Sequence, residues 1–237
     1  MARTLDPETH ALKRDAFIDV AQRLIQTTGY EELSVQDVLD ELSASKGAFY
    51  HYFGSKADLL EAVVERMADG VAIVWAGVMA EPGLSATRRL EAVFSSLGQY
   101  KTDRRDLVLA VLESWRSDEN AIVREKLRRL VAARMTPILA EIVRQGVADA
   151  EFTPRHPDEA AGVVVSLIQG ANESAVDLYV AAQSGAIGLD AVARVFDAYT
   201  EALERILGVV PGTVTLIDRR LLRLWFSPVD QRIERTA

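Results

Sequence analysis

Hydrophobic residues recur along most of the chain with the spacing of an α-helix. In the first such stretch they are separated by three or four positions, at Phe17, Val20, Ala21, Leu24 and Ile25. The same spacing continues over 35–42 and again over 59–74. No segment alternates hydrophobic and polar residues with the β-branched enrichment that is typical of strands. The pattern therefore predicts an all-α protein.

Serine, glycine and proline positions indicate where these helices begin and end. Ser34 with Asp37, and Ser55 with Asp58, match the arrangement in which a hydroxyl caps a helix and a carboxylate reaches back to it. Glycine and proline separate the longer stretches that follow. After residue 67 we expect helices to Ala80, over Ser85–Lys101, Arg105–Trp115 and Asn120–Asp149, after Pro157, after Gly188, and over Thr213–Phe226.

Residues 34–60 have the outline of a helix-turn-helix. A short amphipathic helix over 35–42 is followed by a polar break and by a second short helix from about Ser45. At about 100° per residue, Phe49 and Phe53 point inward together, whereas His51 points away from them. This pattern predicts a recognition helix that is anchored by two phenylalanines and exposed on its other side.

The exposed side of this helix has the chemistry that DNA requires. Gly47 and Ala48 lack bulk, so the N-terminus of the helix could approach a phosphate closely. Lys46 could reach a guanine edge or a phosphate, and His51 could offer a ring N–H to a base. Tyr50, Tyr52 and Lys56 would add phosphate contacts. These residues together predict a docking surface for double-stranded DNA.

The run Ser45-Lys46-Gly47-Ala48-Phe49-Tyr50-His51-Tyr52-Phe53, with Ser55-Lys56 and Leu59-Leu60 after it, resembles the DNA-binding domain of TetR-family transcriptional regulators. The resemblance covers about residues 10–67 and includes the Gly29-Tyr30 turn. It implies an N-terminal three-helix DNA-binding domain, 1–56, and a C-terminal helical ligand-binding and dimerisation domain, 57–237. The DNA-binding set implied is Ser34, Gln36, Ser45, Lys46, Gly47, Ala48, Tyr50, His51, Tyr52 and Lys56.

One residue departs from the family pattern. Ser43 stands in the turn between the second and third helices, where the family usually has a glycine. Serine adopts a left-handed backbone less readily than glycine does. We therefore expect a strained but workable turn at Ser43.

The resemblance also implies what the rest of the chain does. In the family, the last two long helices pair with those of a second subunit as a four-helix bundle, so we expect a homodimer on a palindromic operator. The residues expected at the dimer interface are Val164, Leu167, Ile168, Ala171, Ala175, Val195, Phe196, Tyr199 and Leu203. Those expected to line a pocket for a small-molecule effector are Trp75, Met79, Phe94, Tyr100, Trp115, Met135, Asn172 and Glu173.

The overall charge opposes a nucleic-acid partner and needs an explanation. The 237 residues contain 27 Lys and Arg against 35 Asp and Glu, for a net charge of −8, whereas phosphate binding requires a basic surface. The distribution of charge can outweigh its sum, because Lys46 and Lys56 are expected on the binding face and the acidic side chains mostly off it. We therefore expect modest non-specific affinity and a reliance on dimeric binding.

Other compositional features exclude several classes of protein. The chain has no cysteine, and its histidines at 10, 51 and 156 lie too far apart for a short zinc motif. We therefore expect no catalytic residues, no metal and no cofactor. No apolar run is long enough for a membrane span, and the first residues do not resemble a signal peptide, so we expect no membrane partner and a cytoplasmic protein.

The favoured interpretation is a repressor that a small-molecule ligand releases from its operator. Two alternatives to it remain. An all-α enzyme would need a nucleophile or an acid and base pair in a cleft, and the sequence has no GxSxG, P-loop or GxGxxG motif. A helical dimerising protein that has lost DNA binding would keep the hydrophobic stripes but lose Lys46, His51 and Lys56, all of which are present. The sequence therefore favours the regulator.

Overall fold

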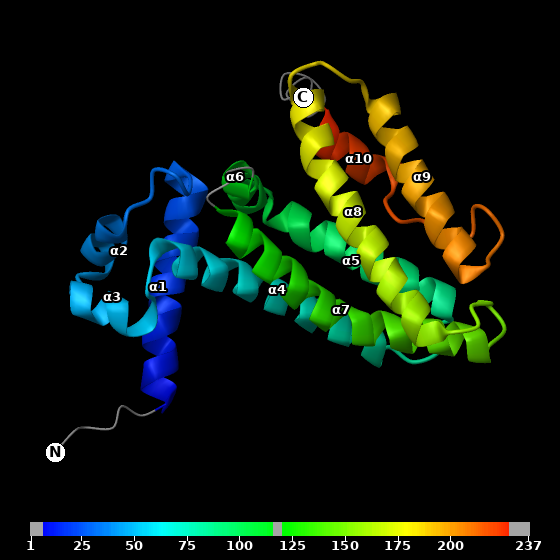
Figure 1. Cartoon of the computed structure of the whole chain (residues 1–237), viewed down its shortest axis with the longest axis horizontal. Coiled ribbons are helices and arrows are strands. Elements are labelled where there is room, and N and C mark those ends of the chain that lie inside the picture. Colours follow the sequence, from blue (N-terminus) through cyan, green and yellow to red (C-terminus); the bar gives the residue numbers. More distant parts are fainter. Residues whose placement is uncertain (1–6, 116–119, 228–237) are drawn as a thin grey trace. The chain divides into compact units, whose positions relative to one another are not determined.

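The computed structural model describes residues 7–115 and 120–227, where helices are joined by turns and loops (Figure 1). The helices are α1 (Pro7–Thr28), α2 (Val35–Leu42), α3 (Lys46–Tyr52), α4 (Lys56–Ala80), α5 (Ala86–Asp103), α6 (Arg105–Trp115), α7 (Ala121–Ala148), α8 (Pro157–Gln183), α9 (Leu189–Leu207) and α10 (Arg219–Phe226). No strand occurs among these described residues. The prediction of an all-α fold is confirmed.

The helices form two compact units. The first contains the described residues up to Gly70 and those of Lys101–Leu130, and the second contains Val71–Tyr100 and the described residues from Val131 onward. The division into functional domains at residues 56 and 57 stays a prediction. None of the described helices is both long and apolar enough to span a membrane.

In the first unit, the short helices α2 and α3 lie beside α1 (Figure 1). The Ser34 hydroxyl accepts the backbone N–H of Asp37, whose carboxylate accepts the Ser34 N–H in return, so α2 begins with a complete capping box. Val38 and Leu39 are the buried residues of α2. An ion pair between Arg23 and Glu41 joins α1 to α2 on the surface.

The turn between α2 and α3 has the backbone predicted for it. Ser43 is left-handed, at φ 50° and ψ 39°, and its N–H donates to the carbonyl of Asp40 at 3.2 Å. Ala44 donates to the carbonyl of Leu39 at 2.9 Å, which completes the end of α2. The serine adopts the conformation for which glycine is better suited, so the strained turn is confirmed.

The second unit has its core where α5, α7, α8 and α9 meet. Leu139, Ile142, Val164 and Leu203 are among the fully buried side chains there. A neighbouring cluster joins Ala171 of α8 and Phe196 of α9 to Leu222 and Phe226 of α10, with the rings of Phe196 and Phe226 5.8 Å apart. The C-terminal helix is therefore part of this core.

The last helix is shorter than predicted. The expected helix over 213–226 begins only at Arg219, because the Asp218 carboxylate caps it by accepting the N–H of Leu221 at 2.6 Å. Before it, the buried carboxylate of Glu204 accepts the N–H groups of Gly212 and Val214, which fixes an irregular loop. The buried residues of this helix are Leu222 and Phe226, whereas Leu224 is 41% exposed.

Candidate nucleic-acid interface

The helix α3 is buried on one side and exposed on the other. Phe49 and Phe53 are 0% and 3% exposed. Lys46, Gly47 and His51 are exposed, and Tyr50 is 59% exposed. The predicted orientation of this helix is confirmed, and Gly47 leaves little bulk at its N-terminal end.

Aromatic packing holds α3 from behind. The ring of Phe17 lies 5.9 Å from that of Phe49 and 6.1 Å from that of Phe53, with steep angles between the rings. The guanidinium of Arg14 lies 5.5 Å from the centre of the Phe53 ring. A helix of two turns is not stable alone in water, so these contacts with α1 fix its position.

The N-terminus of α3 is open to an anion. The Ser45 hydroxyl caps the helix by accepting the N–H of Ala48 at 3.2 Å. A Cβ added at Gly47 would meet only the Ser45 oxygen, at 3.9 Å, so no packing inside the protein requires a glycine there. Its small size instead lets an outside group approach the first turn, at the end of the helix that attracts anions.

At the start of α2, the predicted DNA-binding residues are engaged in local contacts. Ser34 is the cap, and its hydroxyl and backbone N–H bonds hold the pKa of the Asp37 carboxyl below its usual value. The amide of Gln36 donates to Asp40 at 2.6 Å, one turn along the helix. Both Ser34 and Gln36 remain exposed, so their contacts position them at the surface.

Lys56 joins the first turn of α4 to the loop before α2. Its ammonium group donates to the carbonyl of Glu31 at 3.1 Å and lies 4.3 Å from the centre of the Tyr30 ring. This contact was not foreseen from the sequence, because no local spacing relates Tyr30 to Lys56. Lysine has three N–H donors, so the bond to Glu31 leaves two for other partners.

A group of rings extends the exposed side of α3 toward the beginning of α1. The ring of His10 lies 5.3 Å from that of His51 and 4.7 Å from that of Tyr52, while the rings of His51 and Tyr52 are 4.9 Å apart. His51 is exposed, and His10 and Tyr52 are half-buried. His10 was missed in the sequence, where nothing marks its contact with α3.

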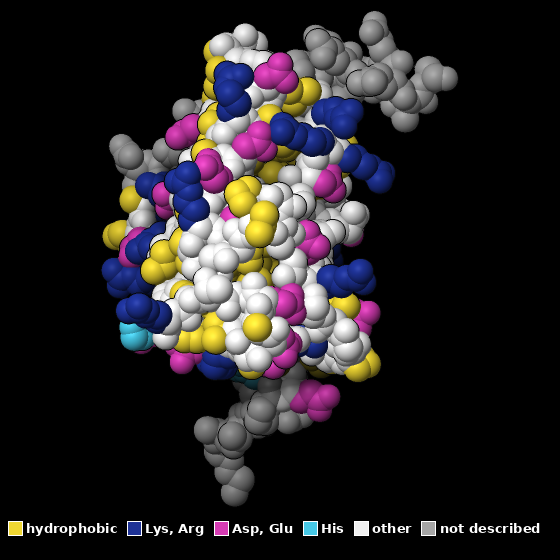
Figure 2. Space-filling view, turned by 90° about the vertical axis from the view of Figure 1, so that its right-hand side faces the viewer, with side chains coloured by type: hydrophobic (Ala, Val, Ile, Leu, Met, Phe, Trp, Pro, Cys, Tyr) yellow, Lys and Arg dark blue, Asp and Glu magenta, His cyan; other side chains and the backbone are white. Residues whose placement is uncertain are grey.

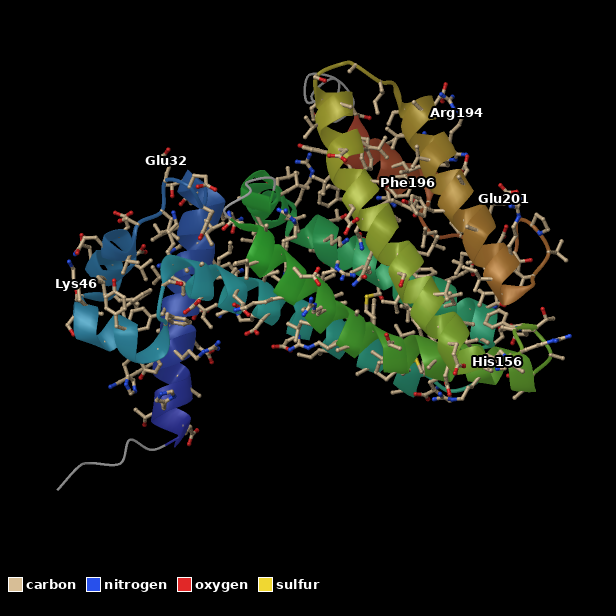
Figure 3. All side chains as sticks on the ribbon, viewed as in Figure 1. Glu32, Lys46, His156, Arg194, Phe196 and Glu201 are labelled. Carbon is tan, nitrogen blue, oxygen red and sulfur yellow. The ribbon has the colours of Figure 1, made fainter. Side chains whose placement is uncertain are left out.

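Some acidic side chains of this region are paired with neighbouring polar or basic side chains. Glu41 and Asp40 are bound to Arg23 and Gln36. Figure 3 shows Glu32 in the loop between α1 and α2 and Lys46 at the start of α3, with their side chains directed differently. Five acidic residues lie on α2 and the loop before it, and α1 carries three more: Glu31, Glu32, Asp37, Asp40 and Glu41, and Glu8, Asp15 and Asp19.

The predicted effector-pocket residues lie in different surroundings, and the pocket itself stays a prediction. Trp75, Phe94 and Met135 are buried in the core of the second unit and Met79 packs against them, while Tyr100 is half-buried. Asn172 and Glu173 are exposed on α8, and the side chain of Trp115 lies outside the described residues. A hollow of about 250 Å³ beside Phe94 is formed by α5 and the segment 215–221.

The predicted dimer residues divide into two groups. Val164, Ile168, Ala171, Phe196 and Leu203 are buried in the single chain, where they form its core. Figure 3 shows Phe196 directed into the unit and Arg194 and Glu201 directed outward from α9. The remaining four, Leu167, Ala175, Val195 and Tyr199, are half-buried.

The outer side of α8 and α9 carries a shallow apolar surface. A hollow of about 580 Å³ is lined by Leu167, Ala191, Arg194, Val195, Ala198, Tyr199 and Ala202. On the face toward α9, Figure 2 shows hydrophobic side chains lying between acidic and basic ones. Three residues predicted at the dimer interface, Leu167, Val195 and Tyr199, therefore lie in this hollow.

The arrangement of α1, α2 and α3 defines a helix-turn-helix, the class of fold that places one exposed helix in the groove of DNA. Residues 17–63 match the family model described as bacterial regulatory proteins, tetR family. This part of the chain is therefore a DNA-binding domain of the TetR type.

Individual relatives agree with this assignment. The HTH-type transcriptional regulator EthR of Mycolicibacterium smegmatis is 30% identical over 94 residues, which are 38% of this chain and 43% of that protein. An uncharacterized HTH-type transcriptional regulator in the lacX 3'region of Lactococcus lactis is 36% identical over 52 residues, which are 22% of this chain and 26% of that protein. The chain thus matches less than half the length of these two curated relatives.

A solved structure is similar over a larger share of the chain. A TetR transcription regulator from Haloarcula marismortui matches with a TM-score of 0.60 and 18% identity, covering 84% of this chain and 97% of that one. At this identity the likeness shows a common fold for most of the chain.

Proposed function

We propose that the protein is a dimeric, sequence-specific DNA-binding regulator, which represses transcription until a small-molecule effector releases it. The observation that carries the proposal is the division of α3 into a buried side, Phe49 and Phe53, and an exposed side with Lys46, Gly47 and His51. The major groove of DNA can accommodate a helix that is packed against its own domain on one side and polar on the other.

The residues of the exposed side have distinct roles in this proposal. Lys46 and the first-turn backbone of α3 approach a phosphate or a guanine edge, and His51 offers a ring N–H to a base. Gly47 and Ala48 allow the helix to enter the groove. Phosphate contacts come from Tyr50, Tyr52 and Lys56, and from Ser34, Gln36 and Ser45 at the starts of α2 and α3.

Dimerisation accounts for binding by so small a basic surface. A second copy would cover the apolar hollow on α8 and α9, where Leu167, Val195 and Tyr199 belong to the predicted set. Two recognition helices would then read a palindromic operator, with its half-sites about one turn of DNA apart. Each half-site contributes few phosphate contacts, and the pair supplies the affinity.

An effector would act through the second unit. The helix α4 begins beside α3 and continues past Gly70 into that unit, so an effector that favours one arrangement of α4 would move the recognition helices out of register. The alternative function is that of a dimerising protein without DNA binding. It predicts that neither the wild-type protein nor variants of α3 bind a specific DNA fragment.

The experiment is a selection of genomic DNA fragments with the full-length protein, followed by fluorescence anisotropy on the fragment recovered. We expect a palindromic site and an affinity that falls as salt rises. Lys46→Ala should weaken binding, whereas Lys126→Ala, which removes a surface lysine paired with Glu61, should not. Equal binding to selected and scrambled fragments would overturn the proposal.

A further inference from the structure

His10 lies at the side of the recognition helix. Its ring contacts His51 nearly edge to face, at 5.3 Å and 73°, and is tilted over Tyr52 at 4.7 Å. Tyr52 in turn contacts the buried ring of Phe17 at 5.8 Å. The exposed imidazole of His51 is thus braced by two rings, one of which comes from the beginning of α1.

The charged groups around this pair are mostly basic. On α1, Lys13 and Arg14 lie three and four residues after His10 and so share its side of the helix, and Glu8 lies two residues before His10. On α3 the charged side chain is Lys46, and Tyr50 and Tyr52 carry phenols. On α4, Glu65 lies 3.8 Å from Arg14 and offsets part of that charge.

We propose that His10 is a positioning residue for His51 and that the two imidazoles together make DNA binding stronger as the pH falls from 8 to 6. The inference rests on the proposed function, because it concerns the surface that would meet DNA. Histidine is the side chain whose charge ordinarily changes in this pH range.

The edge-to-face contact explains why the two rings act together. Such a contact suits a pair in which at least one ring is neutral, since two imidazolium ions at this separation repel each other. Lys13 and Arg14 add to that repulsion. A DNA phosphate beside the pair supplies the negative charge that allows both rings to be protonated, so binding DNA takes up protons.

The size of the effect follows from linkage. Suppose that the charged form of one histidine binds DNA about ten times more tightly than its neutral form. The affinity then rises by up to about tenfold as the pH falls and that histidine becomes charged. We therefore expect the wild-type protein to gain more than tenfold from pH 8 to pH 6. His10→Phe keeps the aromatic contact but cannot be charged, so its affinity should rise several-fold less than that of the wild-type protein from pH 8 to pH 6.

The test is fluorescence anisotropy of the full-length protein on its selected operator, at constant ionic strength and several pH values. His10→Ala removes the brace as well as the charge, and should bind more weakly than His10→Phe at every pH. The control is His156→Gln, since His156 is exposed at the start of α8 in the other unit and should leave the pH profile unchanged. Figure 3 shows the position of His156.

A second measurement examines the ring pair without DNA. In NMR spectra of the free protein, the ring-proton resonances of His51 should move in His10→Ala, because the ring of His10 lies 5.3 Å from that of His51. Unchanged His51 resonances in His10→Ala, or a full pH dependence of DNA binding in His10→Phe, would overturn the inference. If the His51 signals change as expected but no DNA is bound at any pH, the contact between the two rings is supported and the proposed function is wrong.

Discussion

The ammonium group of Lys56 lies 4.3 Å from the centre of the Tyr30 ring and donates to the neighbouring carbonyl of Glu31. This contact ties the start of α4 to the loop that precedes α2. Lys56 therefore stabilises the position of this loop against α4, in addition to any contact with phosphate. Lys46, in contrast, is exposed at the first turn of α3.

Replacing these two lysines should separate the two roles. Lys56→Met should lower the free energy of unfolding by about 1 kcal/mol, through loss of the cation–π contact and the hydrogen bond. Lys46→Met should leave it unchanged within about 0.5 kcal/mol. Each variant should reduce the salt dependence of DNA binding by about one phosphate contact.

Chemical denaturation and anisotropy at several salt concentrations measure the two effects. Equal stabilities of the two variants would show that the contact of Lys56 with Tyr30 and Glu31 has no energetic weight.

The short helices of the first unit were predictable because their signals are local. Ser34 and Asp37 lie within one turn of each other, so the sequence alone placed the start of α2 at Val35. The inward direction of Phe49 and Phe53 follows from the helical period alone. In contrast, the contacts of His10 with His51 and of Lys56 with Tyr30 join distant segments, for which a single sequence has no signal.

In the second unit, the sequence predicted the apolar helix faces but not the segments that pack on them. The period of α8 and α9 identified apolar stripes correctly, but it could not say what covers them. Val164 and Phe196 are covered by their own chain, and α10 packs against Phe196, so only part of the predicted stripe is left for a partner. The irregular loop before Arg219 was missed because it depends on the buried Glu204, a long-range contact.

Replacing Ser43 with glycine should stabilise the protein. The φ of 50° at Ser43 is costly for a residue with a Cβ, so Ser43→Gly should raise the free energy of unfolding by about 0.5–1 kcal/mol. Denaturant unfolding measures this change. Ala150, at φ 58°, offers a matched second site, and Ala150→Gly should act in the same direction. A loss of stability in Ser43→Gly would show that the turn is not strained.

The carboxylate of Glu151 should make stability depend on pH. It accepts the N–H groups of Ala86 and Thr87, each at 3.0 Å, at the start of α5. Burial raises the pKa of Glu151, but these bonds and those from the Thr87 and Ser85 side chains outweigh it and hold the pKa below the ordinary 4.5. The folded protein thus favours the charged form.

Glu151→Gln should therefore lower the free energy of unfolding at pH 7 by about 1 kcal/mol, as expected for loss of a helix cap. Because the folded pKa is depressed, the wild-type advantage is fully present above pH 4.5 and disappears as the pH falls through the folded value. Urea unfolding of both proteins between pH 7 and pH 3 checks this. A difference that stays constant over this range would exclude the carboxylate as its cause.

Charge placed on the outer side of α9 should separate the proposed dimer. Ala198 is exposed and lines the apolar hollow of α8 and α9, so Ala198→Arg would bring two like charges near the twofold axis. We expect a monomer by sedimentation, an unchanged helical spectrum, and at least tenfold weaker binding to the palindrome, with half-site binding less affected. Ala186→Arg, at an exposed position outside the hollow, is the control and should remain dimeric. A dimeric Ala198→Arg protein would place the interface on another surface.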